Sequence, residues 1–233
     1  MGGLLLAADY HWTLANERDG EFTVNADVLN AITNFINLGN SFAVVTSGAT
    51  RHVKGLSALM GKVYLALENG LIVVKPSGER IINAPAQWWR LRDEVKAHLS
   101  VLGVRFSEGE VSLFTENSKA VIDALSSFDV KLEVNRNMLS IMPKGVDKGY
   151  AINVLRRLIK PSLVISIGDA ENDIPMLRAA DIPVAVGNAL PEVKGIARYV
   201  TRGEDGQGVV ELIGIILNCR GDVARCIDEA RGS

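Results

Sequence analysis

Short apolar runs alternate with amphipathic stretches at both ends of the chain, and this alternation limits the fold more than any other feature. Near the N-terminus, residues 4–8 and 42–45 are apolar runs, and residues 28–36 place their apolar side chains on one helical face. Near the C-terminus, residues 151–158 have helical spacing and residues 163–167 form another apolar run. Strands that alternate with helices build a parallel sheet with helices on both faces. The sequence therefore predicts an α/β core of three layers.

The middle of the chain follows a different pattern, in which a helical stretch is twice followed by two short strand-like runs. These segments lie at residues 87–102, 104–106, 111–115, 119–128, 130–134 and 138–142. Such a pattern is typical of a small α+β layer with an antiparallel sheet. We therefore expect residues 1–83 and 148–233 to form the core, and residues 84–147 to form a cap domain inserted into it.

Composition and charge exclude several classes of partner. The 233 residues include 25 basic and 27 acidic side chains, a net charge of −2, so neither nucleic acid nor an anionic membrane is an expected partner. No apolar run reaches the roughly 20 residues that span a bilayer. The apolar start lacks the basic leader of a signal peptide. We therefore expect a cytoplasmic protein that does not bind membranes.

The two cysteines, Cys219 and Cys226, have neither the spacing of a zinc site nor that of a redox CxxC pair. Disulfides are rare in the cytoplasm, so we expect two reduced thiols. A disulfide between the two cysteines is the alternative.

Polar side chains follow three of the predicted strands, at the edge where open parallel sheets bind ligands. The first strand is followed by Asp9, the second by Ser47 and the strand at residues 163–167 by Asp169. Lys148 begins the helix after the inserted segment. The same loops also contain His11, Thr13, Gly48, Asn172 and Asp173. Carboxylates in this number suit Mg²⁺, which prefers oxygen ligands and a substrate phosphate.

Four segments resemble, in order and spacing, the four motifs of the haloacid dehalogenase (HAD) superfamily. They read LLLAADYHWTL, VVTSG, DKGYAINVL and GDAENDIPML. A further segment, VAVGNALPEVKGIARYVT, is similar to the C-terminal part of the Cof-like branch. Over essentially its whole length the chain resembles archaeal phosphoglycolate phosphatases. The resemblance implies a three-layer Rossmannoid parallel sheet core, with the small α+β cap domain inserted between the second and third motifs.

The resemblance also implies an activity and a role for each matching residue. The family hydrolyses phosphomonoesters with Mg²⁺, through an aspartyl-phosphate that would form here on Asp9. Lys148 would neutralise charge on Asp9 and on the transferred group. Ser47 would donate a hydrogen bond to a phosphoryl oxygen, and Gly48 and Asn172 would complete the substrate-binding set. The implied metal ligands are Asp9, His11 through its backbone carbonyl, Asp169 and Asp173.

Two positions of the first motif depart from the family. The family has a second aspartate two residues after the nucleophile, usually followed by glycine, whereas this chain has His11 and Trp12 there. That aspartate is the family's general acid and base, and such catalysis is typically worth about 10²–10⁴-fold. Histidine is also a competent acid and base. However, a nearby Mg²⁺ would disfavour its protonated form, and its ring is bulkier than a carboxylate.

Three hypotheses follow from this departure. In the first, the chain is a working phosphatase in which His11 replaces the aspartate as catalytic acid and base. In the second, it is a catalytically impaired protein that binds phosphate or a metabolite and turns it over slowly. In the third, the side chain of His11 is a metal ligand and favours a transition metal.

Each site residue also has a purely structural alternative. Asp9 and Asp173 are suited to capping a turn or a helix. Ser47 is a common turn residue, and Lys148 would be solvated in the first turn of a helix. Sequence spacing alone does not separate these roles from the catalytic ones.

The cap is expected to set specificity for the substrate, a small phosphorylated metabolite. Its loops at residues 107–110 and 135–137 are the candidates for contacting the leaving group. The basic cap residues that could meet a substrate carboxylate are Arg105, Lys119 and Arg136. Arg51 lies close to the second motif, where many Cof-like members have an arginine. The sequence does not distinguish phosphoglycolate from a sugar phosphate or another small phosphomonoester, and it leaves a homodimer open.

Overall fold

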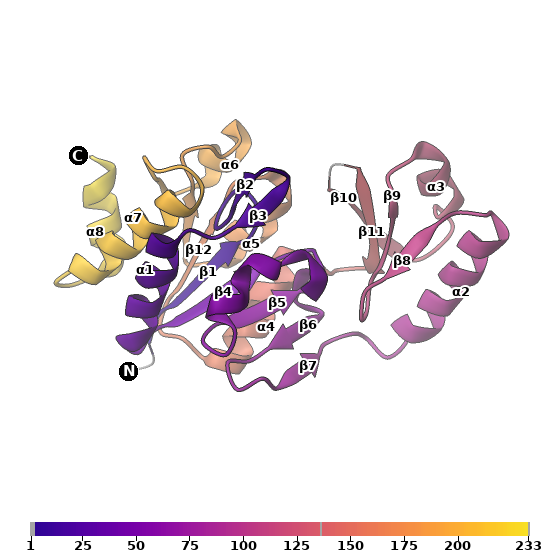
Figure 1. Cartoon of the computed structure of the whole chain (residues 1–233), viewed down its shortest axis with the longest axis horizontal. Coiled ribbons are helices and arrows are strands. Elements are labelled where there is room, and N and C mark those ends of the chain that lie inside the picture. Colours follow the sequence, from indigo (N-terminus) through magenta and orange to yellow (C-terminus); the bar gives the residue numbers. More distant parts are fainter. Residues whose placement is uncertain (1–2, 136, 233) are drawn as a thin grey trace.

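The computed structural model describes residues 3–135 and 137–232, and Figure 1 shows a larger core beside a smaller cap. The core strands are β1 Leu5–Asp9, β4 Ser41–Val45, β5 Tyr64–Leu67, β6 Ile72–Val74, β7 Arg80–Ile82, β12 Val164–Gly168, β13 Ile182–Ala185 and β14 Tyr199–Val200. Within the described residues they form one eight-stranded sheet in the order β14-β13-β12-β1-β4-β5-β6-β7. The first strand of the chain therefore lies at the centre of the sheet, between β12 and β4.

The predicted parallel sheet is confirmed for the strands from β14 to β5, whereas β6 and β7 run antiparallel at one edge. In the turn between β6 and β7, the N–H of Lys75 donates to the carbonyl of Glu79. Gly78 in this turn has φ +85°, a conformation that glycine adopts without steric cost.

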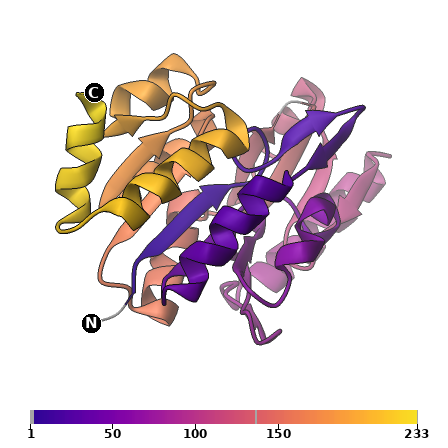
Figure 2. The same ribbon diagram turned by 60° about the vertical axis from the view of Figure 1, so that its left-hand side comes forward.

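Helices cover both faces of the core sheet, as Figure 2 shows. The core helices are α1 Ala26–Asn37, α4 Lys148–Ile159, α5 Ile174–Ala179, α6 Pro191–Ile196, α7 Asp205–Asn218 and α8 Val223–Arg231. In β1, Leu6 and Ala8 belong to the same apolar cluster as α1 and α7, whereas Leu5 and Ala7 cluster with α4. A strand that is buried on both faces has a continuous apolar sequence rather than an alternating one. This burial explains why the first strand reads as an unbroken apolar run.

The cap is a second, smaller α+β layer. Its elements are α2 Trp88–Val101, β8 Phe106–Glu108, β9 Leu113–Glu116, α3 Lys119–Ala124, β10 Val130–Asn135 and β11 Met138–Pro143. The strands pair antiparallel in the order β10-β11-β9-β8. The predicted fold class is thus confirmed, a three-layer α/β core with an inserted α+β cap. The exact division at residues 84 and 147 stays a prediction.

A buried carboxylate joins the core to the cap. Glu68 lies in the 3₁₀ turn η3 (Glu68–Gly70) and is fully buried. Its two oxygens accept hydrogen bonds from the backbone N–H groups of residues 110–112 in the cap, at 2.6–3.1 Å. The next residue, Asn69, donates to Glu133 of β10 at 3.0 Å. Hydrogen bonds to charged groups contribute about 1.5–3 kcal/mol each, so this turn fixes the cap relative to the core.

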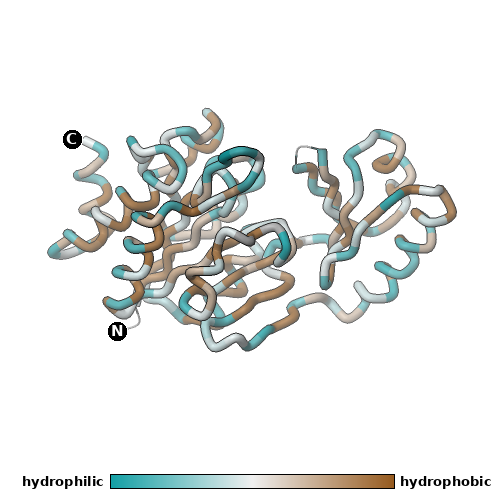
Figure 3. The backbone as a smooth tube through the Cα atoms, in the orientation of Figure 1, coloured by the Kyte–Doolittle hydropathy of each residue, from teal (hydrophilic) through white to brown (hydrophobic). Residues whose placement is uncertain are grey.

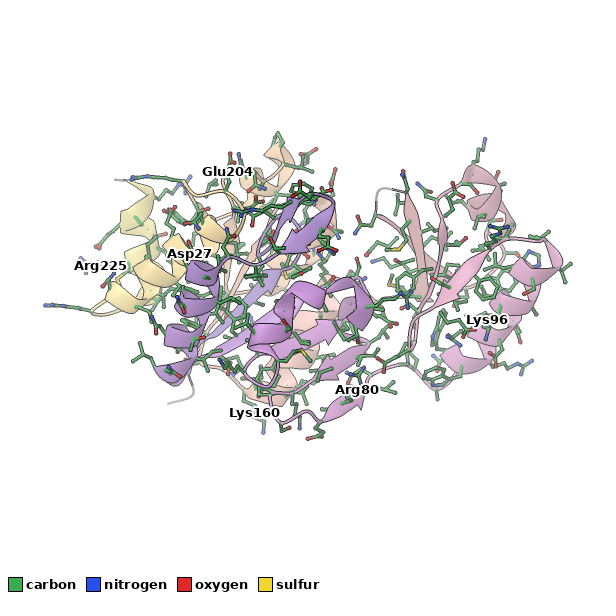
Figure 4. The ribbon with its side chains drawn as sticks, viewed as in Figure 1. Asp27, Arg80, Lys96, Lys160, Glu204 and Arg225 are labelled. Carbon is green, nitrogen blue, oxygen red and sulfur yellow. A yellow bond between two sulfur atoms is a disulfide. The ribbon has the colours of Figure 1, made fainter. Side chains whose placement is uncertain are left out.

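Exposed polar contacts surround the same joint. Arg80 of β7, labelled in Figure 4, forms an ion pair with Glu110 of the cap. Arg51 donates to the backbone carbonyl of Glu108 at 3.0 Å. Exposed ion pairs contribute at most about 1 kcal/mol, so the buried contacts of Glu68 are the main fixed point of the joint.

A short hairpin beside the end of β1 is an element that the sequence did not predict. It consists of β2 (Asn16–Arg18) and β3 (Glu21–Thr23), which pair antiparallel. Asp19 and Gly20 form its tip with φ values of 52° and 80°, and these residue types adopt positive φ more readily than most. Strands of three residues are too short to leave a recognisable alternation in the sequence.

The expectation of two free thiols is wrong in this structure, since Cys219 and Cys226 form a disulfide. Cys219 directly follows α7, and Cys226 lies in α8, which packs against α7. The packing brings their Cα atoms to 5.9 Å, within the range that a disulfide requires. Helix α8 was not predicted, and the contact between the two cysteines depends on it.

Apolar residues concentrate in the strands of the core, where the tube in Figure 3 is largely brown. Among the described residues, no helix combines the length and the apolar character that a bilayer-spanning helix requires.

Candidate functional site

The carboxyl end of the core sheet lies under the cap and holds a cavity of about 740 Å³. Asp9 ends the central strand β1, Ser47 follows β4 and Asp169 follows β12, so three adjacent strands supply side chains to one cavity. Lys148 and Asn172 also line it. From the cap, β10 contributes Val134 and Asn135. The residues that the sequence predicted from separate strands are therefore brought together.

Lys148 connects two of the carboxylates. Its Nζ donates to Oδ1 of Asp9 and to Oδ1 of Asp173, each at 2.5 Å. The lysine is 1% exposed, so the alternative of a solvated surface lysine is wrong. Asp147 caps helix α4 by accepting a hydrogen bond from the N–H of Tyr150 at 2.9 Å, which starts the helix at Lys148. Without the carboxylates of Asp9 and Asp173 as partners, burying the ammonium group of Lys148 would be very costly.

Asp173 orders the loop that carries Asp169. Its second oxygen, Oδ2, accepts hydrogen bonds from the N–H groups of Asp169 (2.9 Å) and Ala170 (3.1 Å). Asp173 therefore caps this turn with one oxygen and contacts Lys148 with the other. A Cβ on Gly168 would lie only 2.6 Å from the carboxylate of Asp173, so glycine is required before Asp169. On the other side, the hydroxyl of Thr13 donates to Oδ1 of Asp169 at 2.9 Å.

The carboxylates of the site have altered proton affinities. Burial raises the pKa of Asp9 to about 8, aided by the charge of Asp173 and opposed by Lys148. Burial and Asp173 also raise the pKa of Asp169 to about 6, against the hydrogen bond from Thr13. Burial alone would lower the pKa of Lys148, but the charges of Asp173 and Asp9 raise it well above its ordinary value. Three carboxylates thus share one ammonium group, and the site has negative charge to spare.

This donor set fits a small divalent cation. One oxygen from each of Asp9, Asp169 and Asp173 lies within 4.8 Å of the others. Among the described residues, no hydrogen bond reaches Oδ2 of Asp9 or Oδ2 of Asp169, whereas both oxygens of Asp173 have partners. Hard oxygen donors with excess negative charge are what Mg²⁺ selects.

His11 and Trp12 line the same cavity as Asp9. The ring of His11 packs edge-to-face against Phe22 of β3, with centroids 4.4 Å apart, and against Tyr10 at 4.8 Å. Trp12 has φ +61°, and its carbonyl accepts a hydrogen bond from Asn188 at 2.9 Å. Within the described residues, the His11 side chain is not part of the carboxylate cluster. That arrangement gives no support to a transition-metal site built on the imidazole.

The remaining predicted residues are divided between the site and other places. Ser47 is buried and lines the cavity, and Gly48 lines an adjoining hollow with it. Arg51 contacts the cap at the joint rather than the cavity. Arg105 lines a separate surface hollow, and Lys119 is exposed at the start of α3. Arg136 lies outside the described residues.

Of the two cap loops, residue 135 lines the cavity. In the other, residues 108 and 109 contact Arg92 within the cap, and residue 110 contacts Glu68 at the joint. Sequence reasoning missed Phe22 and Asn188. Asn188 had a usable signal, because it lies in the segment VAVGNALPEV. Phe22 had none, since its contact with the site depends on the hairpin β2–β3.

The chain is similar to several known proteins. A family model described as haloacid dehalogenase-like hydrolase matches residues 113–213. Phosphoglycolate phosphatase 2 of Saccharolobus solfataricus is 34% identical over 218 residues, covering 92% of this chain and 93% of the relative. Phosphoglycolate phosphatase of Sulfurisphaera tokodaii is 33% identical, covering 92% of this chain and 94% of the relative. A haloacid dehalogenase-like hydrolase from Bacteroides thetaiotaomicron has a similar crystal structure, with a TM-score of 0.74 and 18% identity, covering 91% of this chain and 98% of that one.

Proposed function

Because the chain belongs to the haloacid dehalogenase-like hydrolases, we propose that it is a phosphatase that hydrolyses small phosphomonoesters through a phosphoryl group carried on Asp9. The observation that carries this proposal is the position of Asp9. It ends the central strand, contacts Lys148 and lies beside Asp169 and Asp173 in a cavity under the cap. The relatives named phosphoglycolate phosphatase make phosphoglycolate the first substrate to test.

The proposed reaction has two displacements, both at phosphorus. An oxygen of Asp9 forms a bond to phosphorus while the bond to the leaving oxygen breaks, and the leaving oxygen takes a proton from His11. Water then gives a proton back to His11 and attacks phosphorus, which releases phosphate and restores Asp9. Lys148 holds Asp9 in place and offsets charge on it, and the Ser47 hydroxyl donates to a phosphoryl oxygen. Positioning and charge stabilisation supply most of the catalysis in such transfers.

Asp9 and Asp169 are the residues that would hold Mg²⁺ directly, because each keeps an oxygen without another partner among the described residues. The backbone carbonyl of His11 is a further ligand in this proposal. Asp173 would support the site through Lys148 and the 169–170 amides. When bound, the ion would offset the negative charge of nucleophile and substrate together.

A second function remains a candidate because of one observation. His11 stands where the family has its catalytic aspartate, and its ring packs against the rings of Tyr10 and Phe22. A protein with this site could bind phosphate or a phosphorylated metabolite with little or no hydrolysis.

The proposal is tested by hydrolysis of phosphoglycolate, a sugar phosphate and 4-nitrophenyl phosphate, with Mg²⁺ and with a chelator. We expect turnover of at least one substrate with Mg²⁺ and its loss on chelation, restored by added Mg²⁺. Phosphate release is the measurement, and Na⁺ at matched ionic strength is the control. Phosphate binding without turnover of any of these esters, at any pH or with any divalent metal, would support the second function instead.

Mg²⁺ is also expected to raise the melting temperature more at pH 8 than at pH 6. The metal-free fold holds a proton on Asp9 below a pKa of about 8, whereas the unfolded chain releases it near 3.8. Stability without metal therefore falls as pH rises through this window, and Mg²⁺ binds more tightly as the proton leaves. One proton over two pH units is worth up to about 2.7 kcal/mol, or roughly 5–10 °C for a chain of this size.

The measurement is thermal unfolding with and without excess Mg²⁺ at the two pH values. Asp169→Asn removes one proposed ligand and should reduce the Mg²⁺-dependent rise at both. Equal rises in the unaltered protein at pH 6 and pH 8 would contradict binding at these carboxylates.

A further inference from the structure

A second hollow of about 330 Å³ opens beside the main cavity, and three of its seven lining residues carry aromatic rings. His11, Trp12 and Phe22 line it from the core, and Met138 lines it from the cap. Its polar rim includes Ser47 and Asn135. Of the described residues that line this hollow, none is lysine, arginine, aspartate or glutamate.

The rings are held in fixed positions. The ring of Phe22 lies 4.4 Å from His11 and 5.3 Å from Trp12, nearly perpendicular to both at 81° and 88°. Such edge-to-face pairs are favourable beyond the area they bury. Phe22 is carried by the hairpin β2–β3, and its carbonyl accepts a hydrogen bond from the hydroxyl of Tyr10 at 3.4 Å. The aromatic wall is thus preorganised, which lowers the cost of binding a flat ligand.

The hollow is placed to receive a leaving group. It shares His11, Trp12, Ser47 and Asn135 with the cavity that contains Asp9. An ester whose phosphoryl group lies at Asp9 would therefore extend its alcohol toward the rings. The cap side of the hollow is set by the joint, because Glu68 and Asn69 hold the cap to the core.

The chemistry of this wall favours an uncharged, flat group. Aromatic rings gain from burial against other rings and from stacking or edge-to-face contact. Among the described lining residues, a carboxylate in the same place could pair only with the protonated form of His11. That proton is the one given to the leaving oxygen, so the carboxylate would lose its hydration without a lasting ion pair. His11 and Trp12 replace an aspartate and a glycine of the family pattern, so two of the three rings are features of this chain.

We propose that this hollow is the leaving-group subsite and that the preferred substrates are phosphomonoesters of alcohols carrying a planar aromatic ring. The inference rests on the proposed phosphatase function, since it assigns the alcohol part of the substrate of that site. It predicts a preference against phosphoglycolate, whose leaving group carries a carboxylate.

The test compares benzyl phosphate, ethyl phosphate and phosphoglycolate, three esters of primary alcohols, with Mg²⁺. We expect kcat/KM for benzyl phosphate to exceed that of the other two by about tenfold or more. Phe22→Ala should remove most of this preference, and Phe22→Leu, which keeps apolar bulk, should remove part of it. Trp89 is an exposed aromatic residue of the cap that does not line the hollow. Trp89→Ala is therefore the matched control and should keep the preference for benzyl phosphate.

Binding of benzylphosphonate and ethylphosphonate, measured by calorimetry, separates this inference from the function on which it rests. Tighter binding of benzylphosphonate that is lost in Phe22→Ala, with no turnover of any ester, would support the subsite and overturn the phosphatase proposal. Turnover of all three esters at similar kcat/KM would overturn the subsite and keep the phosphatase. Unfolding curves of the two Phe22 variants show whether a lost preference is due to misfolding. If Phe22→Ala does not fold, the partial loss of preference expected in Phe22→Leu is the test of the subsite.

Discussion

Replacing Asp9 by asparagine is expected to lower phosphomonoester hydrolysis by about 10⁴-fold or more while leaving the protein at least as stable. The amide is not a nucleophile, and loss of a single nucleophile in a concerted site has cost as much as 10⁶-fold elsewhere. Stability should not fall, because burial disfavours the ionised form of Asp9 and raises its pKa to about 8. At pH 8 and above, the neutral amide removes that cost in the metal-free protein.

The two readouts together identify the role of Asp9. Phosphate release measures the rate of hydrolysis, and thermal unfolding in the presence of a chelator measures the stability of the metal-free protein. Asp27→Asn is the control, because Asp27 is an exposed acid on α1, labelled in Figure 4, whose partner is Gln207. It should change hydrolysis by less than twofold. An Asp9→Asn protein that loses both activity and stability would instead indicate a structural carboxylate, and one that keeps its activity would rule out Asp9 as the nucleophile.

The parts of the site that could be predicted from the sequence are those that follow from the ends of strands. Asp9, Ser47 and Asp169 each come directly after an apolar run, and parallel strands bring such positions to one edge. The exact contacts of Lys148 were less accessible. Its burial between Asp9 and Asp173 depends on where helix α4 begins, and that start is set by the capping contact of Asp147.

The parts that could not be predicted depend on tertiary packing without a strong local pattern. Glu68 reads as an ordinary polar residue after a strand, yet it is fully buried and binds three amides of a segment more than 40 residues away. Phe22 reaches the site only because a hairpin with three-residue strands forms beside β1. The disulfide depends on how α8 packs against α7. In each case the deciding partner is distant or belongs to a weakly patterned element.

Restoring the family residue with His11→Asp is expected to raise the rate of hydrolysis by about tenfold to 10³-fold. A carboxyl group at this position can protonate the leaving oxygen without adding a positive charge beside Lys148 and a bound cation, whereas protonated imidazole adds one. General acid–base catalysis is typically worth about 10²–10⁴-fold, and His11 already supplies part of it in the proposed mechanism. The gain should therefore be smaller than the full effect, at about tenfold to 10³-fold.

The dependence on the leaving group decides whether the gain has this cause. Ethyl phosphate needs a proton on its leaving oxygen, whereas 2,2,2-trifluoroethyl phosphate, which also lacks a ring, needs much less help. We expect His11→Asp to accelerate ethyl phosphate more than the trifluoroethyl ester, and His11→Asn, which has no acid, to slow ethyl phosphate more. A fall in kcat for both esters in His11→Asp would show that the imidazole, packed against Tyr10 and Phe22, is adapted to this site rather than a handicap. The side chain at position 11 would then serve both the chemistry and, together with Trp12 and Phe22, the aromatic wall of the hollow.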